Sequence, residues 1–162
     1  MLFRSHMQSF VGATKTDGDF ALNDLSGNEI FDRSQATQNI RQRFTIAEIN
    51  AGATLLAAIP GHKYRMIRCT AISVGGAAGA VTTVDVLATQ STSSVKLVAY
   101  AQASLTQSAV LKDGGSGATV LADGASYVAN DANTAITVGK TGSSVTTATH
   151  IDINFTYVIE KA

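Results

Sequence analysis

Short apolar stretches recur through most of the chain and are divided by turn residues. The clearest is the segment 150–161, where apolar and polar positions alternate and Val158 is the exception. A period of two over that length predicts a β-strand with one buried face. The apolar positions of this alternation are Ile151, Ile153, Phe155, Tyr157 and Ile159.

The strand candidates before it are shorter and follow one another closely. Their spacing of roughly 8–15 residues is typical of a β-sandwich or barrel. The segment Ala103–Leu111 fits a strand, with a helical turn as the alternative. The other predicted strands are Phe44–Ala47, Thr54–Ile59, Lys63–Val74, Val81–Ala88, Val95–Tyr100, Thr119–Leu121, Ser126–Ala129 and Ala135–Val138.

The longest candidate, Lys63–Val74, carries apolar residues at both odd and even positions. Strict alternation puts Tyr64, Met66, Ile72 and Val74 on one face and Ile67, Cys69 and Ala71 on the other. A strand that is apolar on both faces indicates a central strand covered on both sides.

Turn residues separate these strands. Pro60-Gly61 and Asp123-Gly124 are turn dipeptides, and Thr141–Ser144 also predicts a turn. Polar loops are expected at Thr89–Ser94 and Asp113–Gly117. The fold class is therefore all-β, a β-sandwich, and about eight strands in two sheets would form a jelly roll.

The chain changes character near residue 42. Residues 1–41 show neither a helical nor a strand period, yet they contain four of the six phenylalanines of the chain: Phe3, Phe10, Phe20 and Phe31. A disordered tail would be poorer in aromatic residues. We expect an extended N-terminal arm over 1–41 and a β-sandwich domain over 42–162, with a short helix over Ser34–Arg43 as the alternative to extended chain there.

Composition changes this picture in one respect. Only 15% of the 162 residues are charged and the formal net charge is zero, so the chain has no overall attraction to nucleic acid or acidic membranes. A weakly charged surface keeps a free monomer poorly soluble, which indicates coverage by partners. No N-terminal signal peptide or membrane span is evident, so we expect synthesis in the cytoplasm.

Candidate chemistry is sparse. His6, His62 and His150 have no Cys, Asp, Glu or His at metal-ligand spacing, and no nucleotide-binding or nucleophile motif occurs. His62 is expected at a solvated strand start and His150 at the opening of the last strand. Cys69 fits a small buried core residue. We therefore predict no enzyme activity, no catalytic residue, no metal and no cofactor.

One basic cluster stands out. Lys63, Arg65 and Arg68 lie close together, and Arg41 and Arg43 lie near the junction with the arm. Lys63 and Arg65 share a strand face, so they could meet a partner's acidic patch or be a solvated strand end. The predicted partner-binding residues are Phe3, Phe10, Phe20, Phe31, Arg41, Arg43, Lys63 and Arg65.

Two blocks, Thr54–Gly76 and Ala118–Gly142 with the strand after it, resemble segments of small tailed-bacteriophage virion proteins. The likeness covers roughly 43–160. Such proteins are similar to head decoration, or cement, proteins. The resemblance implies a compact sandwich, often a jelly roll, on the outer capsid where major capsid protein subunits meet. It also implies a homo-oligomer, with a trimer favoured over a dimer, in a virion made in the host cytoplasm.

Two other functions remain open. The chain could be a receptor-binding or carbohydrate-binding module of a tail fibre or spike, with the loops Thr89–Ser94 and Asp113–Gly117 forming a site. The absence of Trp argues against a sugar platform. It could also be a tail-tube or head-completion protein, which differs from a capsid decoration protein in its location alone.

Overall fold

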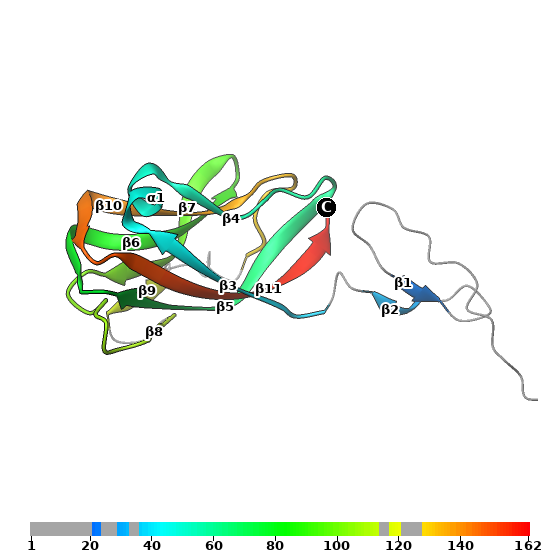
Figure 1. Cartoon of the computed structure of the whole chain (residues 1–162). Coiled ribbons are helices and arrows are strands. Elements are labelled where there is room, and N and C mark those ends of the chain that lie inside the picture. Colours follow the sequence, from blue (N-terminus) through cyan, green and yellow to red (C-terminus); the bar gives the residue numbers. More distant parts are fainter. Residues whose placement is uncertain (1–20, 24–28, 33–35, 114–116, 121–127) are drawn as a thin grey trace, which may run out of the picture.

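The computed structural model describes residues 21–23, 29–32, 36–113, 117–120 and 128–162. Antiparallel β-strands are the main element of these ranges (Figure 1). In chain order the elements are β1 (Ala21–Asn23), β2 (Glu29–Asp32), β3 (Gln38–Thr45), α1 (Ile46–Ala51), β4 (Ala53–Leu56), β5 (His62–Val74), β6 (Ala78–Gln90), β7 (Ser93–Ala101), β8 (Leu111–Lys112), β9 (Ala118–Val120), β10 (Ile136–Thr147) and β11 (His150–Lys161).

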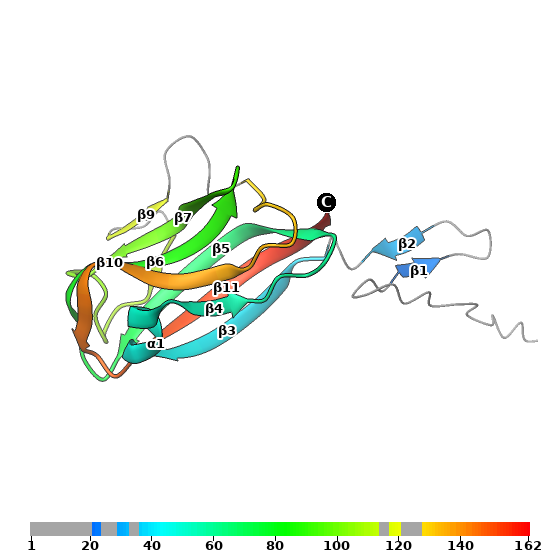
Figure 2. The ribbon, with the colours of Figure 1, turned by 90° about the horizontal axis from the view of Figure 1, so that it is seen from above.

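Two sheets pack face to face. One has four strands in the order β3-β11-β5-β8, and the other has five in the order β4-β10-β6-β7-β9. The layers are seen from the side in Figure 1 and from above in Figure 2. This arrangement confirms the prediction of an all-β sandwich.

The strand pairs nest inside one another along the chain. β3 pairs with β11, β4 with β10, β5 with β8, and β6 with β7. Three further pairings complete the two sheets: β11 with β5, β10 with β6, and β7 with β9, the last of which falls outside the nesting. Each sheet therefore combines strands from the beginning and the end of the sandwich.

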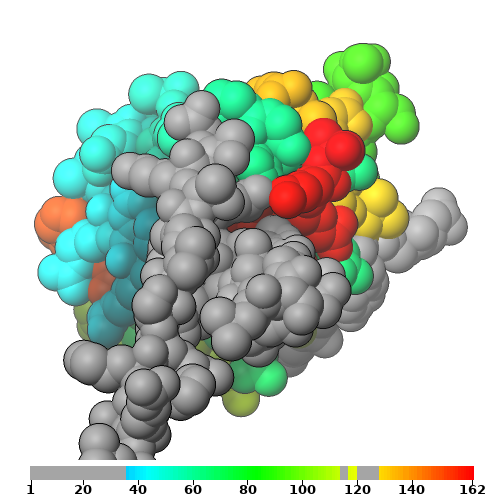
Figure 3. Space-filling model, turned by 90° about the vertical axis from the view of Figure 1, so that its right-hand side faces the viewer, coloured from blue at the N-terminus to red at the C-terminus, as the bar shows by residue number. Residues whose placement is uncertain are grey.

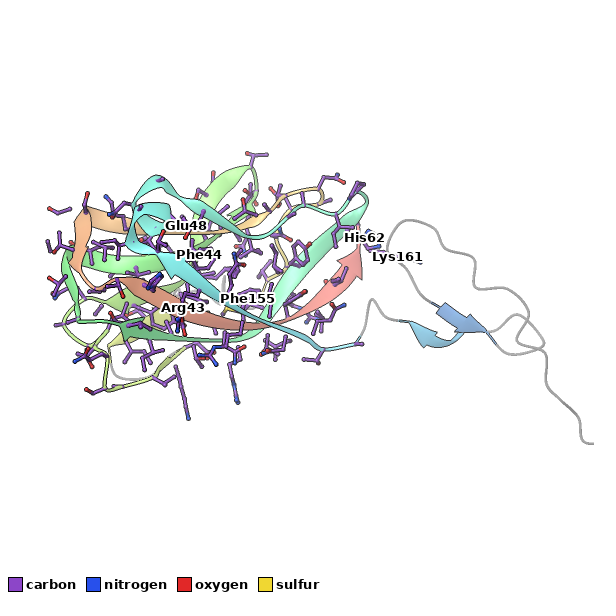
Figure 4. All side chains as sticks on the ribbon, in the orientation of Figure 1. Arg43, Phe44, Glu48, His62, Phe155 and Lys161 are labelled. Carbon is purple, nitrogen blue, oxygen red and sulfur yellow. The ribbon has the colours of Figure 1, made fainter. Side chains whose placement is uncertain are left out.

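The core lies between the sheets and is closed by α1. Its largest fully buried side chains include Tyr100, Phe44, Phe155 and Ile49. Phe44 and Phe155 lie between the layers, whereas Arg43, next to Phe44 on β3, points away from the core (Figure 4). The alternation predicted for residues 150–161 is thus confirmed, since Ile151, Ile153 and Phe155 are all buried.

A β-bulge changes the predicted faces of β5. Thr156 is opposite Arg68 while Tyr157 is opposite Met66, so Ile67 is an extra residue in β5. The insertion shifts the alternation by one residue. Met66 therefore shares the buried face with Cys69, and Ile67 is 46% exposed. The predicted pair of apolar faces was wrong, because it assumed unbroken alternation through Ile67.

The predicted strand Phe44–Ala47 is half strand and half helix. β3 ends at Thr45, and α1 begins at Ile46. Thr45 caps the helix: its Oγ1 accepts from the backbone N–H of Glu48 at 3.3 Å, and the Glu48 carboxylate accepts from the Thr45 backbone N–H at 2.7 Å. β3 begins at Gln38, so the stretch for which a helix was the alternative is partly strand.

Other element predictions also need correction. The expected turn at Thr141–Ser144 lies inside β10, which continues past it with register shifts against β6. Asn50 of α1 holds this irregular part, since its amide side chain bonds both the N–H and the C=O of Val145. In Ala103–Leu111, Leu111 alone belongs to a strand. Of Ser126–Ala129, residues 126 and 127 lie outside the described ranges, and 128–129 are not in a strand.

β1 and β2 form a separate two-stranded sheet in which Leu22 is opposite Phe31. Within the described ranges α1 is the one helix, and six residues are too few to cross a membrane. At the end of the sandwich nearest this hairpin, the N–H of Ala162 donates to the carbonyl of Gly61 at 2.9 Å. Figure 3 shows this end, with the last residues of β11 in red.

Candidate interaction surface

The outer face of the four-stranded sheet collects cations from three strands. Side chains alternate inward and outward along β3, β5 and β8, and the outward positions repeatedly hold arginine or lysine. We call this surface the basic face. Its cations are Arg41, Arg43, Lys63, Arg65, Arg68 and Lys112.

Asp152 organises one end of the basic face. It is opposite Arg43 in the β3–β11 register, and its side chain is only 7% exposed. Arg43 contacts both carboxylate oxygens, with Nε 2.6 Å from Oδ1 and Nη2 2.9 Å from Oδ2, and Arg41 Nη2 lies 3.0 Å from Oδ2. These hydrogen bonds, foremost that from Arg43, lower the pKa of Asp152 to about 2. The same hydrogen bond raises the pKa of Arg43.

Two guanidinium groups share one carboxylate here, so positive charge remains. Both arginines extend into solvent, with side chains 72% exposed for Arg41 and 55% for Arg43. A bidentate contact fixes the plane of the Arg43 guanidinium, which leaves its remaining donors held in place toward solvent. This end of the face therefore presents guanidinium donors to solvent in a fixed orientation.

The other cations of the basic face are less engaged. Arg65 forms an ion pair with Glu160 of β11, and both side chains are partly exposed. Arg68 and Lys112 are exposed and form no ion pair within the described ranges, nor does the half-buried Lys63. Counting Asp152, Glu160 and the nearby Asp113 as its carboxylates, the face has six cations against three anions.

A shallow groove lies among these cations. Its volume is about 270 Å³, and its lining combines Arg41, Asp152 and Asn154 with the apolar Ile72 and Val110. Val110, just before β8, is 56% exposed. Ile67 of β5 is 46% exposed. Arginine is enriched at protein interfaces, and Val110 adds exposed apolar surface beside it.

The two described histidines lie at opposite ends of one strand pair. His62 is opposite Lys161, and His150 is opposite Val74. A separation of eleven residues along a strand is roughly 35 Å, so the two rings cannot serve one site. His62 is buried, with Nδ1 2.8 Å from the carbonyl of Pro60, which corrects the expectation of a solvated position. His6 lies outside the described residues.

Cys69 is buried in the core, as predicted. It has no accessible surface, and burial raises the pKa of its thiol to about 12. Burial likewise raises the pKa of the Tyr100 hydroxyl next to it. Among the described residues, no three His, Cys, Asp or Glu side chains lie together in a way that could hold a metal ion.

The five-stranded sheet carries one buried carboxylate on its outer side. Asp85 is 1% exposed and accepts a hydrogen bond from Thr141 Oγ1 at 2.7 Å. Lys96 Nζ lies 3.2 Å from the same carboxylate oxygen and covers it. The charge of Asp85 is therefore balanced within its own sheet.

The structure places the sequence-predicted binding residues in two groups. Arg41, Arg43, Lys63 and Arg65 lie on the basic face, although in the sequence they form two separate clusters. Of the phenylalanines, Phe3, Phe10 and Phe20 lie outside the described residues, and for Phe31 the backbone alone is described, in β2.

Sequence reasoning missed Asp152, Val110 and Lys112 as members of the surface. Asp152 had one usable signal, because it is a charged residue on the polar side of a strongly alternating strand. Its arginine partners could not be identified, since they are more than a hundred residues away and depend on the β3–β11 register.

No protein-family model matches the chain, and no curated protein and no solved structure is significantly similar to it. The function is therefore argued from the sequence, the fold and the basic face of the chain itself.

Proposed function

We propose that this chain is a structural protein of a bacteriophage virion that decorates the outer capsid surface and stabilises contacts between major capsid protein subunits. It acts there as a homo-oligomer, with a trimer favoured over a dimer. Its work is mechanical, because one body that contacts two neighbouring subunits resists their separation. Repetition of the contact over a shell adds avidity.

The observation that carries this assignment is the nested order of the strand pairs. An antiparallel ribbon running from β3·β11 through β4·β10 and β5·β8 to β6·β7 and rolled into two sheets would produce this nesting, which supports a jelly roll. A jelly-roll body is the architecture that the resemblance to decoration proteins implies. The strand order and the resemblance thus support the same function from independent features.

The surface supports a role in assembly. The basic face combines arginines held on Asp152 with exposed Ile67 of β5 and exposed Val110 just before β8. Arginine is enriched among the anchors that dominate the binding energy of large protein contacts. The low charge of the whole chain further favours a surface covered by partners.

Binding to empty capsids tests the assignment. Purified full-length protein is mixed with capsids that contain only the major capsid protein, and bound copies are counted after sedimentation. We expect saturable binding at a fixed number of copies per capsid subunit, and bound capsids should withstand heating better than bare ones. Image reconstruction of the decorated particle then gives the symmetry of the bound oligomer.

Three outcomes would overturn this assignment. Absence of binding to the capsid is one. Labelling of the virion tail instead of the head would favour a tail-tube or head-completion protein. A strong and specific signal on a glycan array would favour a receptor-binding module, whose site we would then seek at the groove beside Val110.

A further inference from the structure

The basic face has an excess of positive charge and no described segment covering it. Arg68 and Lys112 have no ion-pair partner within the described ranges, and Arg41 and Arg43 share the single carboxylate of Asp152. Exposed Ile67 and Val110 lie among these cations. An occupant of this surface should therefore be rich in carboxylates and should also bring apolar side chains.

A segment of the same chain has that composition. Residues 16–32 contain five acidic residues and no lysine or arginine. Aromatic and aliphatic residues are interspersed with the acidic ones. The acidic residues are Asp17, Asp19, Asp24, Glu29 and Asp32, and the apolar ones are Phe20, Ala21, Leu22, Leu25, Ile30 and Phe31.

The structure describes part of this segment as the hairpin β1–β2, which requires other structure to pack against. β1 and β2 form a sheet of only two strands, with three and four residues. A two-stranded hairpin alone is marginally stable in water and requires packing against other structure.

We propose that the acidic segment 16–32 of one copy docks on the basic face of a second copy. This inference rests on the homo-oligomer of the proposed function and not on its binding to the capsid, because it concerns contacts between copies. Seventeen residues span up to about 55 Å when extended, and as a hairpin they still cross a four-stranded sheet about 15–20 Å wide. Carboxylates of the segment meet Arg41, Arg68 and Lys112, and its apolar residues cover Val110 and Ile67.

Exchange of this segment between copies explains how a weakly charged chain forms a defined oligomer. A head-to-tail contact, with a segment of one copy on the face of the next, closes into a ring if the rotation allows it. A ring of three such contacts is the trimer favoured above. Each copy donates one segment and receives another, so no basic face stays open.

Charge reversal on either side tests the docking. One full-length variant carries Arg68→Glu and Lys112→Glu, both at exposed positions without ion pairs in the described structure. The other carries Asp17→Lys, Asp19→Lys and Asp24→Lys. Analytical ultracentrifugation should show each variant alone shifted toward monomer, with self-association weakened by about tenfold or more. Wild-type association should also weaken between low salt and about 0.5 M NaCl.

An equimolar mixture of the two variants is the decisive sample. In the mixture, lysines of one segment can meet glutamates of the other copy's face, and the unaltered segment and face remain complementary, so contacts between unlike variants should be restored. A ring of three retains one contact between like variants, so the mixture should form mixed dimers or even-numbered rings in place of a full trimer. A matched control with Ser94→Glu and Thr119→Glu adds acidic residues at exposed positions of β7 and β9, on the other sheet. This control should associate like the wild type, and circular dichroism verifies that every variant is folded.

The results separate docking in trans from its alternatives. Single variants that associate like the wild type would overturn the inference and leave the basic face to a different protein. Weakened variants whose mixture stays monomeric would overturn docking in trans and indicate a segment that folds back on its own body. Capsid binding by monomeric variants would leave the decoration function intact, so the two proposals fail separately.

Discussion

At the residue scale, the feature with the largest electrostatic consequence is Asp152. A carboxylate buried under two guanidinium groups is stabilised in its charged form by both, and removal of both arginines would leave an uncompensated buried charge. The contact also connects β11 to the edge strand β3, so it stabilises the sheet margin next to the basic face.

Replacement of this carboxylate should give a pH-dependent loss of stability. The folded-state pKa of Asp152 is about 2 and lies below the value near 4 of an unfolded chain, so its contribution is complete above pH 4 and disappears as the pH falls toward 2. Because the arginines are exposed, we expect Asp152→Asn to lower the free energy of unfolding at pH 7 by only about 1–2 kcal/mol. Urea unfolding at pH 7 and pH 2 measures this difference.

Glu160→Gln is the matched control. It breaks the more exposed pair with Arg65 and should cost about 0.5 kcal/mol or less at pH 7. An Asp152→Asn penalty that is equally large at pH 2 would contradict the electrostatic explanation and indicate a packing defect.

At the element scale, the pattern of apolar and polar residues correctly predicted those strands that depend mainly on neighbouring residues in the chain. The alternation of residues 150–161 is that of β11 from its first to its last residue. The two strands of the hairpin β6–β7 were also predicted, although their pairing was not, and the turn is tighter than the expected loop, with positive φ angles of 51° at Ser91 and 64° at Thr92. Both features depend on neighbouring residues in the chain.

The elements that could not be predicted depend on distant residues. β10 passes through Thr141–Ser144, a typical turn sequence, because β6 pairs with it on one side and Asn50 holds Val145. The bulge at Ile67 is fixed by the register with β11 and not by any glycine nearby. The basic face also depends on residues that are distant in the sequence, since its two cation clusters come together only through the pairing of strands in the sheet.

Loss of the α1 cap should weaken the junction between β3 and β4. Thr45→Ala removes the hydroxyl that accepts from the Glu48 N–H, and caps of this kind are worth roughly 0.5–2 kcal/mol. Thermal unfolding should show a lower Tm for Thr45→Ala and a nearly unchanged Tm for Thr45→Ser, which keeps the hydroxyl. An equal loss for both variants would show that the cap contributes little.

At the scale of the whole molecule, one continuous core joins both sheets. Phe155 from the four-stranded sheet and Tyr100 from the five-stranded sheet are both fully buried in it. Neither sheet can bury its inner face without the other, so the sandwich should unfold as a single unit.

Truncation of one central side chain should therefore affect the entire body. We expect Phe155→Ala to lower the free energy of unfolding by about 3–5 kcal/mol, because a large buried ring leaves a cavity. Far-ultraviolet and tyrosine near-ultraviolet circular dichroism should report one coincident urea transition at a lower midpoint. Phe155→Leu should lose less. Separate transitions for the two signals would show that the sheets unfold independently.

The nested pairing has a consequence for how the chain is made. β11, the last strand of the sandwich in chain order, lies between β3 and β5, the first and third of its strands. The four-stranded sheet consequently lacks its middle strand until β11 has been synthesised, and the edges of the earlier strands stay unpaired until then. Such long-range closure folds slowly and exposes intermediates to mispairing. Emergence of β11, and not synthesis of the first half, is therefore the step at which the sandwich can close.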